Sequence, residues 1–201
     1  AMAMQLTADQ ESIRETLERV CLEFEDDYWL EHAESGDFPE EFYRAMADGG
    51  WLGIAMPEEF GGAGLGVTEA SIMMHTVAKT RGAMSAASAI HMNIFGPHAI
   101  TVFGNQEQKE RWIPDLIAGE YKSCFGVTEP NSGLNTANLQ TRAERTNSGW
   151  VVNGRKIWTS TAQVASKILL IARTTPQEDC AKPMDGLSLF FTDLDRNFCD
   201  V

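Results

Sequence analysis

The residues best suited to chemistry lie in the stretch 125–133, which reads Phe-Gly-Val-Thr-Glu-Pro-Asn-Ser-Gly. An apolar run typical of a strand ends there at a cluster of turn-forming residues. Thr128 and Glu129 stand at this junction, where a hydroxyl, a carboxylate and backbone amides would face a ligand together. Glu129 has the chemistry of a base, but we interpret it as a structural residue that binds the amides of its own turn. The stretch is the main candidate for a ligand-binding site.

A second aromatic stretch, Lys-Ile-Trp-Thr-Ser at 156–160, is the other candidate. We expect it to form a strand whose alternation places Trp158 and Ser160 on one face. By the same alternation, Phe125 and Val127 share a face of the first strand. A flat slot between two such strands suits an aromatic cofactor, which needs walls and oriented donors. The spacing alone leaves an alternative open, in which two unrelated strands pack their aromatic residues in a core.

The first 120 residues carry the signals of α-helices. Thr7 and Gln10 are three residues apart, as in a capping box, and open a helix with an apolar face. The run 85–95 is rich in small residues and predicts a helix that packs closely, with His91 and Phe95 on one face. Cap or first-turn signals predict further helices at three places: Pro39, Thr68 and Asn105.

After Glu120 the composition shifts toward β-branched, aromatic and turn residues, which indicates a domain boundary. Asn153-Gly154 is the strongest hairpin signal in this half. After the apolar run 123–127, the sequence contains five strand-like segments: 139–145, 150–152, 155–160, 168–172 and 187–191.

The fold class that these signals predict is α+β. An N-terminal all-α helical bundle over 1–120 is followed by an antiparallel β-barrel or sandwich over 121–201. The last strand-like segments are followed by neither a helix nor a cap, which leaves an open sheet edge. We therefore expect the β-barrel domain to be incomplete, and the chain to be truncated or partly represented.

Composition excludes several classes of function. The chain has 29 acidic and 16 basic residues and a net charge of -13, which disfavours nucleic acid as a partner. It contains no apolar run of the roughly 20 residues that a membrane span needs, and no signal-peptide pattern. Its four Cys and four His residues form no metal-binding signature. We expect a cytoplasmic protein with reduced thiols and no metal site.

The two candidate stretches together resemble a known family. Thr128-Glu-Pro-x-x-Gly133, followed by Asn153-Gly-Arg-Lys-Ile-Trp-Thr-Ser160, is similar to the flavin-binding core of the acyl-CoA dehydrogenases, and the similarity covers the whole chain. In that family the threonine at the position of Thr128 hydrogen-bonds near flavin N5. The resemblance implies that FAD is the cofactor and that eight residues contact it: Phe125, Val127, Thr128, Gly133, Leu134, Trp158, Thr159 and Ser160.

The resemblance also implies an acyl pocket and one departure from the family pattern. The helix that carries His91 and Phe95 corresponds to one that lines the acyl pocket, so these residues and Leu134 are candidate substrate contacts. The family usually has Gly-Ser-Asp or Gly-Thr-Asp where this chain has Gly133-Leu134-Asn135. A hydroxyl that commonly serves the cofactor pyrophosphate or the substrate is therefore missing at Leu134, which leaves room for altered phosphate contacts or a different flavin reaction.

The activity that the resemblance implies belongs to fatty acid metabolism. It is FAD-dependent α,β-dehydrogenation of an acyl-CoA thioester to a trans-2-enoyl-CoA, with electrons passed to an electron-transfer flavoprotein, in a homotetramer or homodimer. The catalytic carboxylate of the family lies in a C-terminal helical domain that this chain lacks. We therefore expect no catalytic residue here and no activity from this fragment by itself. Two alternatives remain: a flavin monooxygenase or nitroalkane-oxidising enzyme on the same fold, and a non-catalytic helical interaction module.

Overall fold

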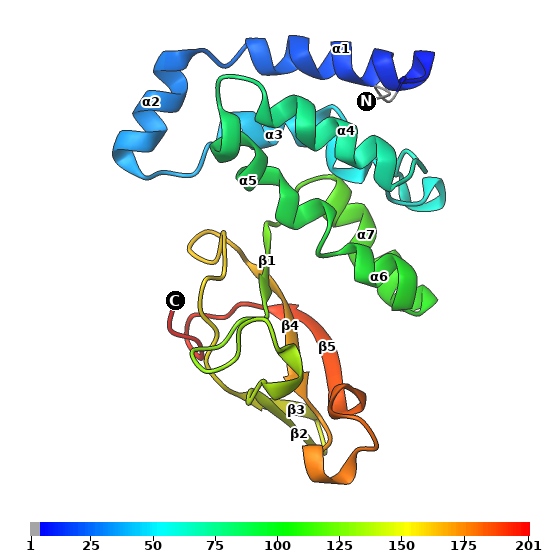
Figure 1. The fold of residues 1–201 in the computed structure, drawn as a ribbon, viewed down its shortest axis with the longest axis vertical. Helices are drawn as coiled ribbons and strands as arrows, with labels where there is room; N and C mark the ends of the chain where they lie inside the picture. Colours follow the sequence, from blue (N-terminus) through cyan, green and yellow to red (C-terminus); the bar gives the residue numbers. More distant parts are fainter. Residues whose placement is uncertain (1–4) are drawn as a thin grey trace. The chain divides into compact units, whose positions relative to one another are not determined.

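The computed structural model describes residues 5–201, so the first four residues of the predicted domain 1–120 lie outside it. The chain divides into two compact units, Ala1–Tyr121 and Lys122–Val201. The first unit is helical and the second is built around a sheet (Figure 1). The α+β class is therefore correct at the level of helices followed by a sheet.

The helical unit contains seven α-helices within its described residues. They are α1 Ala8–Leu22, α2 Asp26–Ser35, α3 Glu40–Asp48, α4 Val67–Ala78, α5 Ala83–Ile94, α6 His98–Phe103 and α7 Gln106–Ile117. The capping box predicted for Thr7 and Gln10 is confirmed, because each side chain accepts a hydrogen bond from the other residue's backbone amide. Asn105 caps α7 in the same way with Gln108.

The start of α4 differs from the prediction. Gly66, and not Thr68, is the N-cap residue, and its amide donates to the Glu69 carboxylate at 3.0 Å. The second oxygen of Glu69 accepts a 2.9 Å hydrogen bond from the side chain of Gln10 on α1. The helix begins two residues earlier because this carboxylate, at the third helical position, serves the free amide and α1 together.

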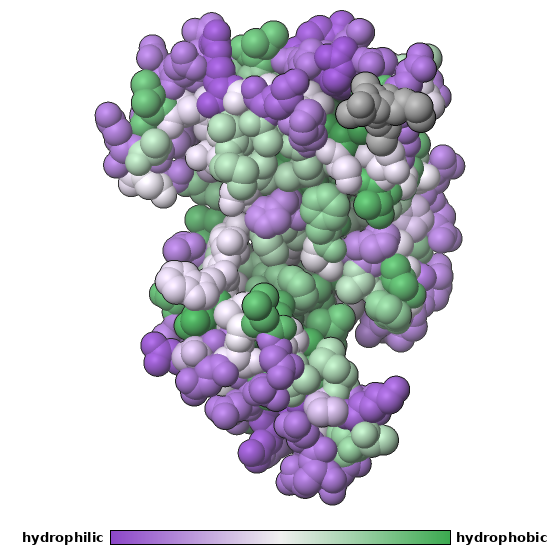
Figure 2. Space-filling view, viewed as in Figure 1, coloured by the Kyte–Doolittle hydropathy of each residue, from purple (hydrophilic) through white to green (hydrophobic). Residues whose placement is uncertain are grey.

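The core of the helical unit is formed by side chains without solvent exposure. Its largest members are Leu17, Phe42, Tyr43, Met46, Leu52, Met73, Val77 and Ile90. Helix α1 packs against α4 and buries Leu17, while its acidic residues Glu11 and Glu18 form ion pairs with Arg14. Hydrophilic residues cover most of the outer side of α1 in the view of Figure 2, as its sequence pattern predicts.

The sheet of the second unit has five strands. They are β1 Ser123–Gly126, β2 Arg142–Thr146, β3 Gly149–Asn153, β4 Lys167–Arg173 and β5 Leu187–Asp193. Strand β4 is central: β1 pairs with its first half in parallel, β5 runs antiparallel along its whole length, and β2 meets its end at Arg173. The prediction of an antiparallel barrel is therefore wrong, since the sheet is open and mixed. Parallel neighbours need a long crossover connection, and the segment that contains the β2–β3 hairpin supplies it between β1 and β4.

The hairpin expected at Asn153-Gly154 is also wrong. Strands β2 and β3 pair from Arg142 with Asn153 to Thr146 with Gly149, so the turn lies at 147–148. Residues 155–160 form no strand. Gly154 has a different role: a Cβ atom there would lie 2.2 Å from Thr141 Oγ1, so only glycine permits this close approach.

The packing of α1 yields a prediction. Replacing Leu17, which is 0% exposed, by Ala should lower the free energy of unfolding of the helical unit by about 2–5 kcal/mol, because it leaves a cavity. Leu22→Ala on the same helix, where the side chain is 58% exposed, should change it by about 0.5 kcal/mol or less. Urea unfolding followed by circular dichroism measures both. Equal losses would contradict the observed packing of α1.

Candidate functional site

The stretch that follows β1 folds into a tight turn. Glu129 and Ser132 exchange backbone hydrogen bonds of 3.0 and 3.1 Å, and the Ser132 hydroxyl donates to the Asn135 carbonyl at 2.8 Å. Pro130 and Asn131 form the tip. The turn cluster predicted after the apolar run is thus present, and it holds Thr128 at the exit of the strand.

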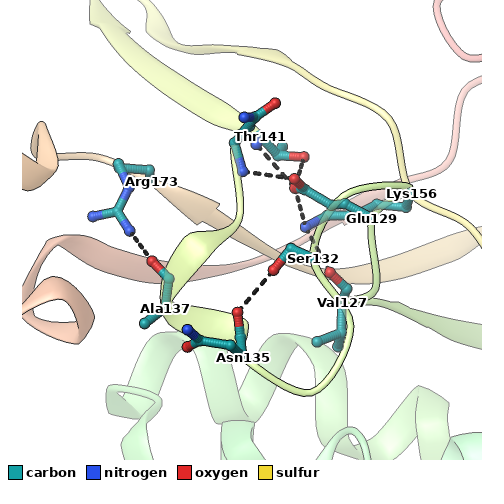
Figure 3. A network of polar contacts seen from close by, with 9 residues as sticks. Val127, Glu129, Ser132, Asn135, Ala137, Thr141, Lys156 and Arg173 are labelled. Carbon is teal, nitrogen blue, oxygen red and sulfur yellow. Dashed lines mark hydrogen bonds and ion pairs between the residues drawn. The ribbon is translucent and has the colours of Figure 1, made fainter.

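The Glu129 carboxylate is buried beneath this turn and receives four hydrogen bonds (Figure 3). The donors are the amides of Gln140 at 2.6 Å and Thr141 at 2.9 Å, the Thr141 hydroxyl, and the Lys156 ammonium at 2.9 Å. Burial alone would raise the pKa of Glu129, but these donors outweigh it and lower the pKa to about 2. Glu129 is therefore ionised at neutral pH. It is structural, as predicted, but the amides that its side chain binds are those of Gln140 and Thr141, so the expectation that it binds its own turn is wrong.

Lys156 joins this carboxylate to the main chain of the candidate site. Its ammonium donates to the Val127 carbonyl at 3.0 Å in addition to Glu129, and its side chain is only 9% exposed. Burial lowers the pKa of Lys156, and the Glu129 charge opposes that effect. The next residue, Ile157, donates its amide to the Thr128 carbonyl at 2.9 Å. The two sequence stretches predicted to form one site therefore lie side by side.

The aromatic residue of the second stretch points away from the core. Trp158 is 86% exposed and has a backbone φ of 58°, in the left-handed region that larger side chains rarely adopt. The alternative in which this aromatic packs in a core is thus excluded within the second unit. Since 155–160 is not a strand, the expected common strand face of Trp158 and Ser160 is wrong as well.

The remaining cofactor candidates differ in their exposure. Phe125 lies in β1 opposite Leu169, and Val127 and Thr128 are half-buried just beyond the strand. Leu134 is fully exposed, and the space beside the Cα of Gly133 is open. Thr159 is half-buried and Ser160 exposed. The structure thus groups Val127 and Thr128 with the segment around Trp158, while Gly133 and Leu134 lie past the tip of the turn.

The candidate substrate residues His91 and Phe95 belong to the helical unit. His91 lies on α5, half-buried, with its ring Nδ1 3.1 Å from the Ser88 carbonyl. Phe95 is the C-cap residue of α5 and is exposed. They are one helical turn apart, as the sequence predicts.

Three basic residues that sequence analysis did not single out hold the loops of this unit. Besides Lys156, the buried Arg173 donates to the carbonyls of Ala137 at 2.8 Å and Pro183 at 3.1 Å. Arg196 donates to four carbonyls, among them that of Ala162 at 2.7 Å, and so closes the loop that follows Ser160. The signal for Lys156 was a lone lysine inside an aromatic stretch, but its partners are too distant in the sequence to be read from it.

The arrangement offers binding and no evident acid–base chemistry. Neither the amide nor the hydroxyl of Thr128 is engaged in a hydrogen bond within residues 5–201, so both can serve a ligand. In the same described part, no group of three or more His, Cys, Asp or Glu residues is placed to hold a metal ion. No helix among these residues has the length and apolarity to cross a bilayer. The donors of Thr128 that are free within the described residues and the exposed ring of Trp158 therefore suit a flat aromatic ligand with hydrogen-bonding atoms.

Comparison with known proteins gives the same picture for both units. The family models described as "Acyl-CoA dehydrogenase, N-terminal domain" and "Acyl-CoA dehydrogenase, middle domain" match residues 7–120 and 124–198. An acyl-CoA dehydrogenase of Bacillus subtilis is 31% identical over 157 residues, covering 78% of this chain and 40% of its own length. The mitochondrial isovaleryl-CoA dehydrogenase of Bos taurus is 30% identical over 171 residues, which are 84% of this chain and 40% of that protein.

A solved structure agrees with these relatives. The glutaryl-CoA dehydrogenase of Mycobacterium smegmatis in complex with FADH2 superposes with a TM-score of 0.81 at 28% identity, covering 94% of this chain and 46% of that one. The chain spans less than half the length of each of these three relatives. Since the two family models together match most of the sequence, the chain belongs to the acyl-CoA dehydrogenase family.

Proposed function

We propose that this protein is an FAD-dependent acyl-CoA dehydrogenase, which removes hydrogen from Cα and Cβ of an acyl-CoA thioester to give a trans-2-enoyl-CoA. The observation that carries the proposal is that Thr128, whose amide and hydroxyl are free within the described residues, is hydrogen-bonded to the segment that carries the exposed Trp158. The chain that holds them matches two domains of this family. When bound, FAD would supply the two-electron acceptor that protein side chains lack.

The residues present fit such a cofactor. Thr128 provides a hydroxyl and an amide without partners in the described residues, which match the nitrogen and oxygen atoms of a flavin ring. Trp158 provides an exposed aromatic face, and the open space beside Gly133 allows a ligand to approach the backbone. In this proposal Phe125, Val127, Thr159 and Ser160 complete the contacts.

Glu129 takes no part in proton abstraction under this proposal. A carboxylate with a pKa of about 2 is a weak base at neutral pH, and its oxygens are already occupied by donors. The base that removes the α-proton would come, as in the family, from a C-terminal helical domain. Residues 1–201 by themselves are accordingly proposed to bind the cofactor without turning over substrate.

The remaining parts of the proposal concern substrate and partners. His91 and Phe95, one helical turn apart on α5, are proposed to contact the acyl chain. Leu134 of the second unit is proposed as a further substrate contact. The enzyme would pass its electrons to an electron-transfer flavoprotein and work as a cytoplasmic homotetramer or homodimer in fatty acid metabolism. Leu134, where the family usually has a hydroxyl residue, would leave one phosphate contact of the cofactor unmade.

The reaction itself can be tested with purified protein that carries these two units together with the C-terminal helical domain of the family. We expect flavin absorption bands as prepared, and bleaching of these bands by an acyl-CoA in the absence of oxygen. Re-oxidation by an electron-transfer flavoprotein should be much faster than by oxygen. Faster re-oxidation by oxygen would favour the monooxygenase or nitroalkane-oxidising alternative. A colourless protein that takes up no added FAD would favour the non-catalytic interaction module.

The aromatic wall can be tested by substitution. Trp158→Ala should raise the dissociation constant for FAD about 10-fold, since aromatic contacts contribute on the order of 0.5–1.5 kcal/mol beyond the area that they bury. Trp150→Ala is the matched control, because Trp150 lies on β3 and packs against Phe190. It should leave FAD affinity unchanged. An equal loss in both variants, measured by titration of flavin fluorescence, would contradict the assigned position of the cofactor.

The ionisation of Glu129 predicts a pH dependence. Because the folded-state pKa of about 2 lies below the ordinary 4.5, ionised Glu129 stabilises the fold fully above about pH 4.5 and loses this effect as pH falls toward 2. The unfolding free energy of the wild type relative to Glu129→Gln should therefore shrink by on the order of 3 kcal/mol between about pH 5 and pH 2. Urea unfolding across this range measures it. A difference in unfolding free energy that stays constant with pH would mean that folding does not lower the pKa of Glu129.

A further inference from the structure

Lys156 is tied to both sides of the residue that is the best hydrogen-bonding candidate of the site. Its ammonium binds the Val127 carbonyl, which precedes Thr128, and the Glu129 carboxylate, which follows it. The adjacent Ile157 amide binds the carbonyl of Thr128 itself. Three consecutive residues of the first stretch are thus bonded to two consecutive residues of the second. Figure 3 shows Lys156 with Val127 and Glu129.

We propose that Lys156 is a positioning residue, whose ammonium holds the 127–129 and 156–158 segments in the arrangement that forms the flavin slot. This inference rests on the proposed function, because the slot is defined by the cofactor. Lys156 does not touch the cofactor in this proposal. It acts through the backbone of Thr128 and through the start of the Trp158 segment.

Stability alone gives a weak reason for such a lysine. Burying an ion pair costs desolvation that its attraction roughly repays, so apolar replacements of similar volume are often tolerated. Glu129 also has three donors without Lys156, namely the Gln140 amide and two groups of Thr141. The bond that only Lys156 provides is the one to the Val127 carbonyl, and this bond fixes the path of the main chain.

The segment that Lys156 holds has few other constraints. Residues 155–160 have no strand partner, and Trp158 is largely exposed, so its own packing cannot set its position. With φ values of 58° at Trp158 and 69° at Thr161, the backbone persists in rarely populated conformations. Such conformations are kept only where the surrounding bonds determine them. On the N-terminal side of Trp158, the hydrogen bonds that determine the backbone are those of Lys156 and Ile157.

The test compares two variants with a matched control. Lys156→Met removes the ammonium but retains the apolar stem, and Lys156→Met with Glu129→Gln also removes the carboxylate charge that would be left without its cation. Lys167→Met is the control, because Lys167 pairs with Asp193 at the β4–β5 edge. Two quantities are measured: hydrogen exchange of the Ile157 amide in flavin-free protein, and the dissociation constant for FAD.

We expect Ile157 exchange to become at least about 10-fold faster in both Lys156 variants and FAD binding at least about 10-fold weaker, with Lys167→Met like the wild type. In both Lys156 variants, exchange of the β4 amides should be accelerated less than exchange of the Ile157 amide, which separates loss of position from loss of stability. Unchanged Ile157 exchange or unchanged FAD affinity in the Lys156 variants would overturn the inference. If the wild type itself took up no FAD, the proposed function would fail, and the inference would fall with the slot that it requires, even if Ile157 exchange changed.

Discussion

The buried carboxylate of Glu129 is the constraint on which the second unit depends. A charge removed from water must recover its hydrogen bonds inside the protein. Glu129 recovers them from residues 11, 12 and 27 positions further along the chain. One side chain thereby ties the turn after β1 to the approach to β2 and to the segment beyond β3. The local fold of three loops follows from satisfying a single ionised group.

Cations complete this arrangement in a common way. The sheet has short strands, and long loops between them leave carbonyls without ladder partners. Carbonyls outside the ladder need other donors, and Lys156, Arg173 and Arg196 supply them to loops at Val127, Ala137 and Ala162. An acidic chain thus uses some of its few basic residues to bind the main chain. Their positions near the ends of strands let a small sheet hold long loops in place.

The sequence predicted features that arise from local interactions. The capping box at Thr7 is a contact between residues three apart, and the turn near Glu129 follows from its proline and glycine neighbours, so both were readable. The sequence could not predict the parallel pairing of β1 with β4, because it joins segments about 44 residues apart, such as Ser123 and Lys167. The hairpin predicted at Asn153-Gly154 is wrong for a physical reason: this glycine allows close contact with Thr141 and forms no turn between strands. Likewise, the bonds from Lys156 to Val127 and Glu129 cross 29 and 27 residues, beyond the reach of any spacing rule.

Trp158 stays exposed because hydrogen bonds fix the chain on both sides of it. A large aromatic side chain in water, on a left-handed backbone, costs free energy on the order of 1–3 kcal/mol and has no compensation in its own packing. The bonds that maintain it lie on either side, with Lys156 and Ile157 before it and Arg196 behind the loop that follows. A segment held at both ends keeps its shape without a ligand. A flat cofactor that covers Trp158 would then meet a ring already in place and would lose less affinity to ordering the site. Under the proposed function, the strained segment would thus be formed before the cofactor binds, and the free energy that it costs would be spent during folding.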